Sequence, residues 1–387
     1  MLASLYHTDQ PVTIGILGGG QLAKMLAQSA YRMGLRVAVI EHGKDSPAGI
    51  MTKHEFGNGW ADDGDLEAFI AASDIVTLEN EFIDPSILER IAEKRLVFPE
   101  PATVALVQDK FIQKRTMAQA GIATPEFAAC NSPEELVAFG ERHGFPIVVK
   151  TRKFGYDGYG NHTARNENDC HSAWNKFMSG EDPRPVMAES YVSFVKELAV
   201  IVARNRRGET AVYPCVQTIQ QNHICVTVLA PAPIEDHLRT EAQRIAVACV
   251  EAINGTGVFG IELFLTADDL IIFNEIAPRP HNSGHYTIEG CHTSQFENGI
   301  RAVCNLPLGS PDLVQGAAAM INILGERRGS GVPDSVVDLM KHPHVALHLY
   351  GKKESRIGRK MGHLTAIGTT VDQAFIRARD AVESLIW

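Results

Sequence analysis

The N-terminal quarter of the chain alternates short β-branched runs with helical patterns, and this order constrains the fold more than any other feature. Between residues 12 and 100, strand-like runs such as VTIGILG and RVAVIE alternate with helical segments such as QLAKMLAQSAYRMG. Strands that are each followed by a helix pair in parallel, because the helix carries the chain back across the face of the sheet. The sequence therefore predicts a parallel β-sheet covered by helices over this region.

A glycine-rich turn, GGGQLA, follows the first predicted strand and has the pattern G-x-G-x-x-A. Glu41 ends the second predicted strand about twenty residues further on, where a dinucleotide-binding protein holds a ribose. The pattern alone has weak specificity. It leaves open a dinucleotide-dependent oxidoreductase, although that function would leave residues 110–360 unexplained.

The pattern of the chain changes near residue 106. A helical stretch, VALVQDKFIQKRTMAQAG, precedes extended segments such as KELAVIVARN and HICVTVLAP, whose alternation is typical of an antiparallel sheet. A helix is predicted through DHLRTEAQRIAVACVEAIN, and GIELFLTADDLIIFNE predicts a hairpin that turns at residues 267–269. From about residue 315 to the end, short strands and two helices, DSVVDLMK and VDQAFIRARDAVESL, predict a small third unit.

Composition excludes several classes of protein. The chain has 387 residues, 45% of them hydrophobic, and a formal net charge of −10. An acidic chain lacks the basic face that nucleic acid requires, and no apolar run reaches the roughly 18 residues of a membrane helix. Seven scattered cysteines without C-x-x-C spacing argue against disulfides or structural zinc. The N-terminus has no secretory pattern, so we expect a cytoplasmic protein.

Lys150 ends the apolar run PIVV, and Gly155, Gly158 and Gly160 follow it closely. Glycines allow tight turns whose N–H groups wrap phosphate oxygens, and a lysine at a strand end adds positive charge. We expect this loop to bind phosphate. A plain hairpin with an exposed lysine is the alternative.

The predicted hairpin carries Glu262 and Glu275 on its two strands, roughly opposite one another. Two carboxylates this close repel unless a cation lies between them, and Mg²⁺ prefers oxygen ligands and substrate phosphates. Asn274 can add a neutral oxygen. The pattern predicts a Mg²⁺ site, and a pair of edge glutamates without a ligand is the alternative.

Two further signals are weaker. Glu189 opens ESYV and Glu197 lies in KELAVIV, where a strand end and a nearby carboxylate suit an adenine edge and a ribose. Five basic residues crowd KKESRIGRK, residues 352–360, in an otherwise acidic chain, which suits a phosphate monoester. Solvated glutamates and a solvated basic loop are the alternatives.

The stretch NEIAPRPHNSGHYT, residues 274–287, follows the apolar run LIIF and is crowded with groups that need partners. Its two prolines restrict the backbone, while carboxylate, amide, guanidinium and imidazole groups lie close together in the sequence. We expect these groups to converge on charged ligands. A solvated loop of unusual composition is the alternative.

Several of these segments together resemble one enzyme family. They are GILGGGQLAKML, QDK-x-x-QK, VVK followed by GYDGYGN, ESYV with KEL, FNEIAPRPHNSGHYT with TSQFE, and GRKMGH. From about residue 12 to 365, this set is similar to the N5-carboxyaminoimidazole ribonucleotide synthetases of purine biosynthesis, which belong to the ATP-grasp superfamily. The combination of NEIAPRPHNSGH with GRKMGH is the specific part.

The resemblance implies a mixed α/β and α+β architecture, the ATP-grasp fold. A Rossmann-like parallel-sheet domain (1–105) would precede an ATP-grasp domain (106–312), with a glycine-loop lid subdomain at about 125–195, and a small C-terminal domain (313–387). The implied enzyme is a ligase that uses ATP and Mg²⁺, or Mn²⁺, to join bicarbonate to aminoimidazole ribonucleotide through carboxyphosphate. A homodimer is expected from the family alone.

The resemblance also implies roles for individual residues. Those expected to bind ATP are Lys110, Lys150, Gly155, Tyr156, Asp157, Gly158, Gly160, Glu189, Val192, Glu197, Gln220, Asn274 and Glu275. Those expected to ligate Mg²⁺ are Glu262 and Glu275. Those expected to act in catalysis are Arg279, His281, Asn282 and Asp157. Those expected to bind the ribonucleotide are Gln21, Glu79, Glu81, Ser283, Lys353, Arg356, Arg359 and Lys360.

The chain departs from the family pattern at two positions. Tyr159 stands where relatives have Arg or Lys in the glycine loop, and Gln220 stands where relatives have His. We expect Lys153 or Arg165 to supply the cation that Tyr159 lacks, because carboxyphosphate must be kept from water. A loop that closes less tightly is the alternative.

Three other functions remain open at this stage. One is a different ATP-grasp ligase, acting on formate, an amino acid or another phosphorylated amine. The second is the oxidoreductase that the glycine-rich turn allows, and the third is a nucleotide-binding regulator without catalysis. The basic segment 352–360 favours a phosphorylated acceptor but does not identify it.

Overall fold

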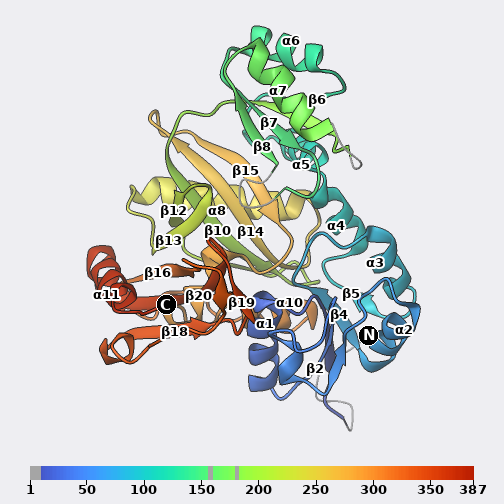
Figure 1. Ribbon diagram of the computed structural model, residues 1–387, viewed down its shortest axis with the longest axis vertical. Helices are drawn as coiled ribbons and strands as arrows, with labels where there is room; N and C mark the ends of the chain where they lie inside the picture. Colours follow the sequence, from blue (N-terminus) through green and yellow to red (C-terminus); the bar gives the residue numbers. More distant parts are fainter. Residues whose placement is uncertain (1–9, 156–159, 179–182) are drawn as a thin grey trace.

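The computed structural model describes residues 10–155, 160–178 and 183–387. The N-terminal part is the five-stranded sheet at the blue end of Figure 1, with the order β3-β2-β1-β4-β5 and parallel pairing throughout, as predicted. Its elements are β1 (Thr13–Leu17), α1 (Gln21–Arg32), β2 (Arg36–Ile40), η1 (Gly49–Met51), β3 (His54–Phe56), α2 (Asp63–Ala72), β4 (Ile75–Leu78), α3 (Pro85–Ala92) and β5 (Leu96–Val97).

The helices cover both faces of this sheet. Helix α1 packs on one face, together with α10 (Gln295–Val303) from a later part of the chain, in a core that includes Ile14 and Phe296. Helices α2 and α3 pack on the other face, in a second core that includes Phe69 and Leu88. Two separate apolar cores therefore sandwich the strands, which explains why β1, β2 and β4 are continuous apolar runs.

The predicted helical stretch after residue 103 is broken into α4 (Pro101–Gln108) and α5 (Lys110–Gln119). Asp109 lies between them with an extended backbone, and its carboxylate accepts hydrogen bonds from the N–H groups of Phe111 and Ile112. Aspartate stabilises a helix start in this way, so it ends one helix and begins the next. The break places Lys110 in the first turn of α5.

A small antiparallel sheet forms the upper lobe in Figure 1, with the order β6-β9-β7-β8. Its apolar face packs against two helices around Leu136 and Phe139. The elements are β6 (Phe127–Cys130), α6 (Pro133–His143), β7 (Ile147–Thr151), β8 (Asn161–Ala164), α7 (Glu167–Met178) and β9 (Val186–Ser190).

A large antiparallel sheet runs through the middle of the molecule, and helix α8 packs on it in a core that includes Phe259 and Phe273. The hairpin predicted to turn at residues 267–269 is confirmed as β14 and β15. The elements are β10 (Phe194–Arg204), β11 (Thr210–Val212), β12 (Val216–Gln221), β13 (Ile224–Ala230), α8 (Asp236–Ala252), β14 (Gly257–Thr266), β15 (Ile271–Ala277), η2 (Asn282–Gly284) and α9 (Thr287–Gly290).

The C-terminal strands continue this same sheet, because β13 pairs with β16 to give the order β15-β14-β10-β12-β13-β16-β20-β18, with β11 beside β10. Helix α11 packs on β16 and β20. The elements are β16 (Ala317–Leu324), β17 (Gly329–Ser330), η3 (Leu339–Lys341), β18 (Val345–Leu349), β19 (Glu354–Ser355), β20 (Lys360–Gly368) and α11 (Val371–Glu383).

One predicted helix in this part is wrong. The segment DSVVDLMK, residues 334–341, forms only the short 3₁₀ turn η3 at its end. Ser335 exchanges backbone hydrogen bonds with Ile386, and this bridge holds the start of the segment in an extended conformation. A contact with the far C-terminus therefore overrides a local helical pattern.

None of the helices in the described ranges combines the length and the apolar character that crossing a bilayer demands.

Candidate active site

The glycine-rich turn before α1 is occupied by carboxylates of the chain itself. Glu79 accepts hydrogen bonds from the N–H groups of Gly20 (2.6 Å) and Ala23 (2.9 Å), and Glu41 accepts one from Gly19 (2.8 Å). Burial raises the pKa of Glu79, and the two N–H groups oppose that effect. A helix start of this kind is where a dinucleotide phosphate would bind. Because Glu79 already lies there, the turn does not support dinucleotide binding.

Glu262 and Glu275 lie directly opposite one another across the β14–β15 ladder, as predicted. The register shifts immediately after this pair, since Leu263 lies opposite Phe273, and Asn274 is the extra residue of a β-bulge. The Asn274 amide nitrogen donates to Glu262 at 3.3 Å, so its side chain lies on the same face as the two carboxylates. The bulge therefore brings three oxygen-bearing side chains together at one point of the sheet.

Lys110 forms an ion pair with Glu275 from the first turn of α5. Burial lowers the pKa of Lys110, but the charge and hydrogen bond of Glu275, together with the charges of Glu189 and Glu262, outweigh it and leave the pKa raised. The helix start is fixed by Arg152, whose guanidinium binds the Asp109 carboxylate with two hydrogen bonds of 3.1 and 2.6 Å. This contact joins the start of α5 to the end of β7, which brings Lys110 close to Lys150.

Lys150 lies at the end of β7 and contacts both the hairpin and β9. Its ammonium group lies 2.8 Å from a carboxylate oxygen of Glu189 and donates to the side-chain oxygen of Asn274 at 3.3 Å. Glu189 is buried, and it also lies 3.4 Å from the ammonium group of Lys114, a buried lysine of α5. The two lysines predicted to contact ATP phosphates therefore lie next to the two carboxylates predicted to hold Mg²⁺.

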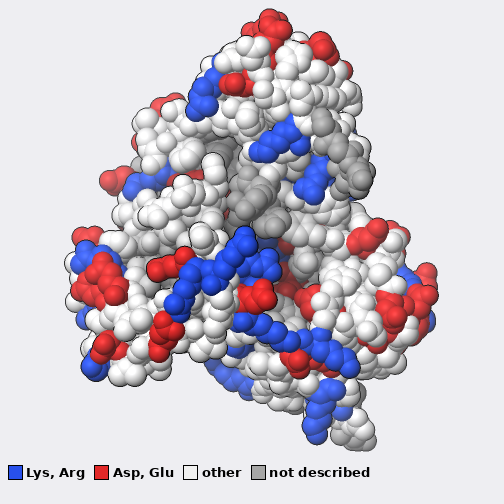
Figure 2. Space-filling model, viewed as in Figure 1, with Lys and Arg blue, Asp and Glu red and all other residues white. Residues whose placement is uncertain are grey.

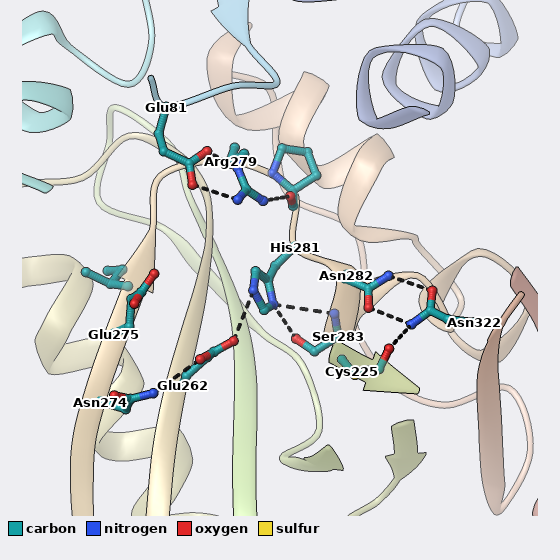
Figure 3. A network of polar contacts seen from close by, with 12 residues as sticks. Glu81, Cys225, Glu262, Asn274, Glu275, Arg279, His281, Asn282, Ser283 and Asn322 are labelled. Carbon is teal, nitrogen blue, oxygen red and sulfur yellow. Dashed lines mark hydrogen bonds and ion pairs between the residues drawn. The ribbon is translucent and has the colours of Figure 1, made fainter. Parts of the chain in front are cut away.

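Arg279 and His281 approach the hairpin from the segment after β15. Arg279 forms a two-pronged ion pair with Glu81, which follows β4 of the N-terminal part (Figure 3). His281 directs its Nε2 toward Glu262 at 3.3 Å and its Nδ1 toward the Ser283 hydroxyl at 2.8 Å. Burial raises the pKa of Glu262, but the contact with His281 and the charges of Lys110 and Lys360 together outweigh it and leave the pKa below its usual value.

Close packing holds the His281 backbone in place. The buried amide of Gln295 accepts from the His281 N–H at 2.9 Å and donates to the His281 carbonyl at 2.8 Å. Gly260 of β14 lies against the histidine, and a Cβ atom at this glycine would overlap the His281 side chain. A neighbouring strand therefore requires glycine for His281 to reach Glu262.

Asn282 is engaged by another amide. Its side chain and that of Asn322 on β16 exchange two hydrogen bonds of 3.0 and 2.7 Å, and Asn322 also donates to the Cys225 carbonyl at 2.9 Å (Figure 3). Both polar ends of Asn282 are therefore used within the protein. The amide pair ties the segment after β15 to the C-terminal part of the sheet.

The basic segment 352–360 lies over β19 and the turn into β20. Lys353 reaches across to Asp45 of the N-terminal part at 3.3 Å, and Arg356 lies 3.6 Å from Glu354. Figure 2 shows a band of Lys and Arg side chains crossing the middle of this face, over the position of β19 in Figure 1. The band borders the region between the N-terminal sheet, the small upper sheet and the large sheet.

Arg359 and Lys360 end this segment. Burial lowers the pKa of Arg359, whose guanidinium donates to the Glu354 carbonyl at 2.6 Å. Lys360 is one of the groups that lower the pKa of Glu262. Its effect is smaller than those of His281 and Lys110, and all three oppose burial, which raises this pKa. The basic segment and the paired carboxylates therefore belong to one electrostatic environment.

The hairpin suits a hard divalent cation. The side chains of Glu262 and Glu275 are 33% and 36% exposed, so a ligand can reach them from outside. Within the described ranges, no three His, Cys, Asp or Glu side chains form a complete metal cage. Mg²⁺ commonly takes one or two protein carboxylates and completes its shell with water and substrate phosphates, and these residues fit that pattern.

The remaining predicted residues lie on other elements of the fold. Gln21 begins α1, Val192 lies between β9 and β10, and Gln220 lies on β12 beside a bulge. Gly160 has a positive φ of 98°, and a Cβ atom there would overlap the Thr151 hydroxyl, so this turn needs glycine. The predicted residues Tyr156, Asp157, Gly158 and Tyr159 lie outside the described residues.

Three family models match successive parts of the chain. The first, described as a ribonucleotide synthetase preATP-grasp domain, matches residues 12–108. The second, an ATP-grasp domain, matches residues 115–296, and the third, a phosphoribosylaminoimidazole carboxylase C-terminal domain, matches residues 318–377.

Similarity to complete proteins extends over nearly the whole chain. The N5-carboxyaminoimidazole ribonucleotide synthase of Synechococcus elongatus is 40% identical over 358 residues, which cover 91% of this chain and 88% of that protein. The chain belongs to the N5-carboxyaminoimidazole ribonucleotide synthase family. The predicted family and the ATP-grasp fold, with its N-terminal parallel sheet, are thereby confirmed.

A solved structure of this synthase family shares the fold closely. The N5-carboxyaminoimidazole synthase of Aspergillus clavatus, in complex with ADP and 5-aminoimidazole ribonucleotide, superposes with a TM-score of 0.87 at 34% identity, covering 96% of this chain and 98% of that one. Some relatives are longer. The phosphoribosylaminoimidazole carboxylase of Ogataea methanolica is 38% identical to this chain over 93% of the chain's length, but the chain spans only 67% of that protein. It spans 65% of the phosphoribosylaminoimidazole carboxylase of Candida albicans.

Sequence reasoning missed three residues that hold this site together. They are Lys114, Gln295 and Asn322. Lys114 follows Lys110 by four residues in QDKFIQK, and residues at this spacing share one face of a helix, so the spacing could have indicated it. Asn322 had no such signal, because its partner Asn282 is forty residues away in the sequence.

Glu197, on β10, is expected to make the stability of the protein depend on pH. Burial, and next the charge of Glu262, raise the pKa of Glu197 to about 7. An unfolded glutamate has a pKa of about 4.3, so between these values the folded state binds more protons and stability falls as pH rises. Denaturant titrations at several pH values should show the wild type losing stability relative to Glu197→Gln up to about pH 7. A stability difference that is independent of pH would contradict this assignment.

Proposed function

We propose that the chain catalyses the ATP-dependent carboxylation of 5-aminoimidazole ribonucleotide by bicarbonate, giving N5-carboxyaminoimidazole ribonucleotide, ADP and phosphate. The observation that carries the proposal is the hairpin site itself, where Glu262 and Glu275 lie opposite each other, Lys110 contacts Glu275 and Lys150 contacts the neighbouring Asn274. This arrangement suits phosphoryl transfer, and it occurs in a chain that belongs to the synthase family.

In the first step, an oxygen of bicarbonate would attack the γ-phosphorus of ATP, forming carboxyphosphate and releasing ADP. Lys110 and Lys150 would neutralise the phosphate oxygens and hold them in line. Glu262 and Glu275, with Asn274, would hold Mg²⁺ or Mn²⁺, which when bound offsets further negative charge on the phosphates.

In the second step, the amine of the ribonucleotide would attack the carbon of carboxyphosphate, forming the new C–N bond and releasing phosphate. Arg279 and His281 lie on the side of the hairpin that faces the N-terminal part, where they would hold the carboxyl group. Lys353, Arg356, Arg359 and Lys360 would bind the phosphate of the ribonucleotide, since the basic segment borders this region.

The nucleotide base and sugar would lie along β9 and β10. The segment after β9, with Val192, presents backbone groups that suit an adenine edge, and Glu197 would hold the ribose hydroxyls. The family resemblance is the basis for two further parts of the proposal, namely a homodimer and a location in the cytoplasm.

Phosphate release from ATP tests the proposed reaction directly. We expect release to require bicarbonate and 5-aminoimidazole ribonucleotide together, with no change in nicotinamide absorbance when NADH is added. A different ATP-grasp ligase would instead respond to formate, an amino acid or another phosphorylated amine. ATP turnover that is indifferent to the ribonucleotide would contradict the proposal.

Glu275→Gln is expected to abolish ATP turnover while the protein stays folded. The substitution removes one of two carboxylates suited to the cation and the partner of Lys110, so phosphoryl transfer should slow by roughly a hundredfold or more at low millimolar Mg²⁺. Asp268→Asn removes the same charge from the exposed turn of the same hairpin and serves as the matched control. Normal turnover in Glu275→Gln would show that this hairpin does not hold the cation.

Arg356→Ala and Lys353→Ala are expected to act on the ribonucleotide alone. If these side chains bind its phosphate, each loss should raise the KM for the ribonucleotide by about tenfold and leave the KM for ATP nearly unchanged. Arg379→Ala, on the exposed surface of α11 in the same C-terminal part, is the control. Equal effects on both substrates would assign the basic segment to another role.

A further inference from the structure

Lys114 is a buried lysine with no place in the reaction proposed above. It lies in the second turn of α5, and its side chain is 1% exposed. Its ammonium group donates to the Phe273 carbonyl at 3.2 Å and lies 3.4 Å from a carboxylate oxygen of Glu189. Burying an ammonium group is costly unless it is paired, so this position calls for a specific reason.

The Glu189 carboxylate is shared between two lysines. The same oxygen, Oε2, lies 2.8 Å from Lys150 and 3.4 Å from Lys114, while the other oxygen is buried without a hydrogen-bond partner among the described residues. Strand pairing explains the contact with Lys150. Glu189 lies opposite Val148 in the β7–β9 ladder, and residues two apart on a strand share a face, which puts Lys150 beside it.

The three side chains carry two positive charges and one negative charge. Lys110 and Glu275 form a neutral ion pair next to them, so the cluster keeps a net charge of +1. Of its two cations, Lys114 faces the Phe273 carbonyl in the interior, whereas Lys150 also reaches Asn274 on the carboxylate hairpin. Of these two lysines, Lys150 is therefore the one placed to contact a phosphate bound at the hairpin.

We propose that Lys114 is a positioning residue for nucleotide binding. Its positive charge balances the negative charge of Glu189, so that Glu189 does not offset the attraction of Lys150 for the phosphates. This inference rests on the proposed function only in placing phosphates at Lys150. Without Lys114, Lys150 is the cation left within ion-pair distance of the buried Glu189 carboxylate in the described part of the chain, and Lys110 acts on it more weakly. The pair is then neutral, and the attraction for phosphate falls.

The electrostatics of the two residues agree with this arrangement. Burial raises the pKa of Glu189, but the charges of Lys114 and then Lys150 outweigh it and leave the pKa below its usual value. Burial lowers the pKa of Lys114 to about 8. Lys114 thus remains protonated at neutral pH, as a counter-charge to Glu189 must.

Four proteins test the charge balance with inorganic tripolyphosphate as the probe, because it has no base or ribose to contact Glu189. The cluster charge is +1 in the wild type, 0 in Lys114→Met, +2 in Glu189→Gln and +1 again in the double variant. We expect Lys114→Met to weaken binding, measured calorimetrically with Mg²⁺, by about ten- to a hundredfold. The double variant should bind within about threefold of the wild type.

Arg115→Met is the matched control, since it removes a positive charge from the exposed side of the same helix. Denaturant titration of each protein reports folding separately. A purely structural role for Lys114 predicts that the double variant binds as weakly as Lys114→Met, and that result would overturn the proposal. If Lys114→Met fails to fold, the double variant is compared with the wild type instead. A tenfold or greater loss of tripolyphosphate affinity in the double variant would then overturn the proposal.

The binding measurement uses neither bicarbonate nor ribonucleotide, so it is independent of the carboxylation assay. A wild type that binds tripolyphosphate but does not consume 5-aminoimidazole ribonucleotide would refute the proposed reaction and leave the role of Lys114 standing. The converse result, carboxylation with binding that does not follow the cluster charge, would refute the role of Lys114 alone.

Discussion

The pairing of Glu262 with Glu275 across the β14–β15 hairpin is the constraint on which the rest of the site depends. Two carboxylates that face each other in a half-buried sheet need positive charge around them. In a regular strand the neighbours Asn274 and Glu275 would point to opposite faces of the sheet. The bulge at Asn274 turns its side chain to the same face as the carboxylates. The hairpin therefore needs positively charged groups from other segments of the chain close to its two carboxylates.

The cations come from segments that are far apart in the sequence. Lys110 arrives from a helix that starts at a capping aspartate and Lys150 from the end of a strand in the small sheet, and the His281 imidazole joins them from the turn after the hairpin. Each is fixed by contacts away from the carboxylates, such as Arg152 with Asp109 and Gln295 with the His281 backbone. Such preorganisation lets charged groups face a ligand without rearranging when it binds.

The glycine-rich turn shows how one sequence pattern can serve different chemistry. In a dinucleotide-binding protein the N–H groups of such a turn receive a phosphate, whereas here they receive the carboxylates of Glu79 and Glu41. A side chain supplied by the neighbouring strand satisfies the same hydrogen-bond donors. The turn thereby joins β1, β2 and β4 of the N-terminal sheet instead of holding a cofactor.

Local features of the sequence were enough to predict the parallel N-terminal sheet, the β14–β15 hairpin and the opposition of its glutamates, because strand alternation and turn residues act over short distances. The tertiary structure alone decided the partners of these residues. Glu189 between Lys114 and Lys150, Asn282 with Asn322, and the loss of the helix at 334–341 all depend on contacts between distant segments. Burial makes such pairings strong, and which charges become buried together is set only when the sheets and helices pack.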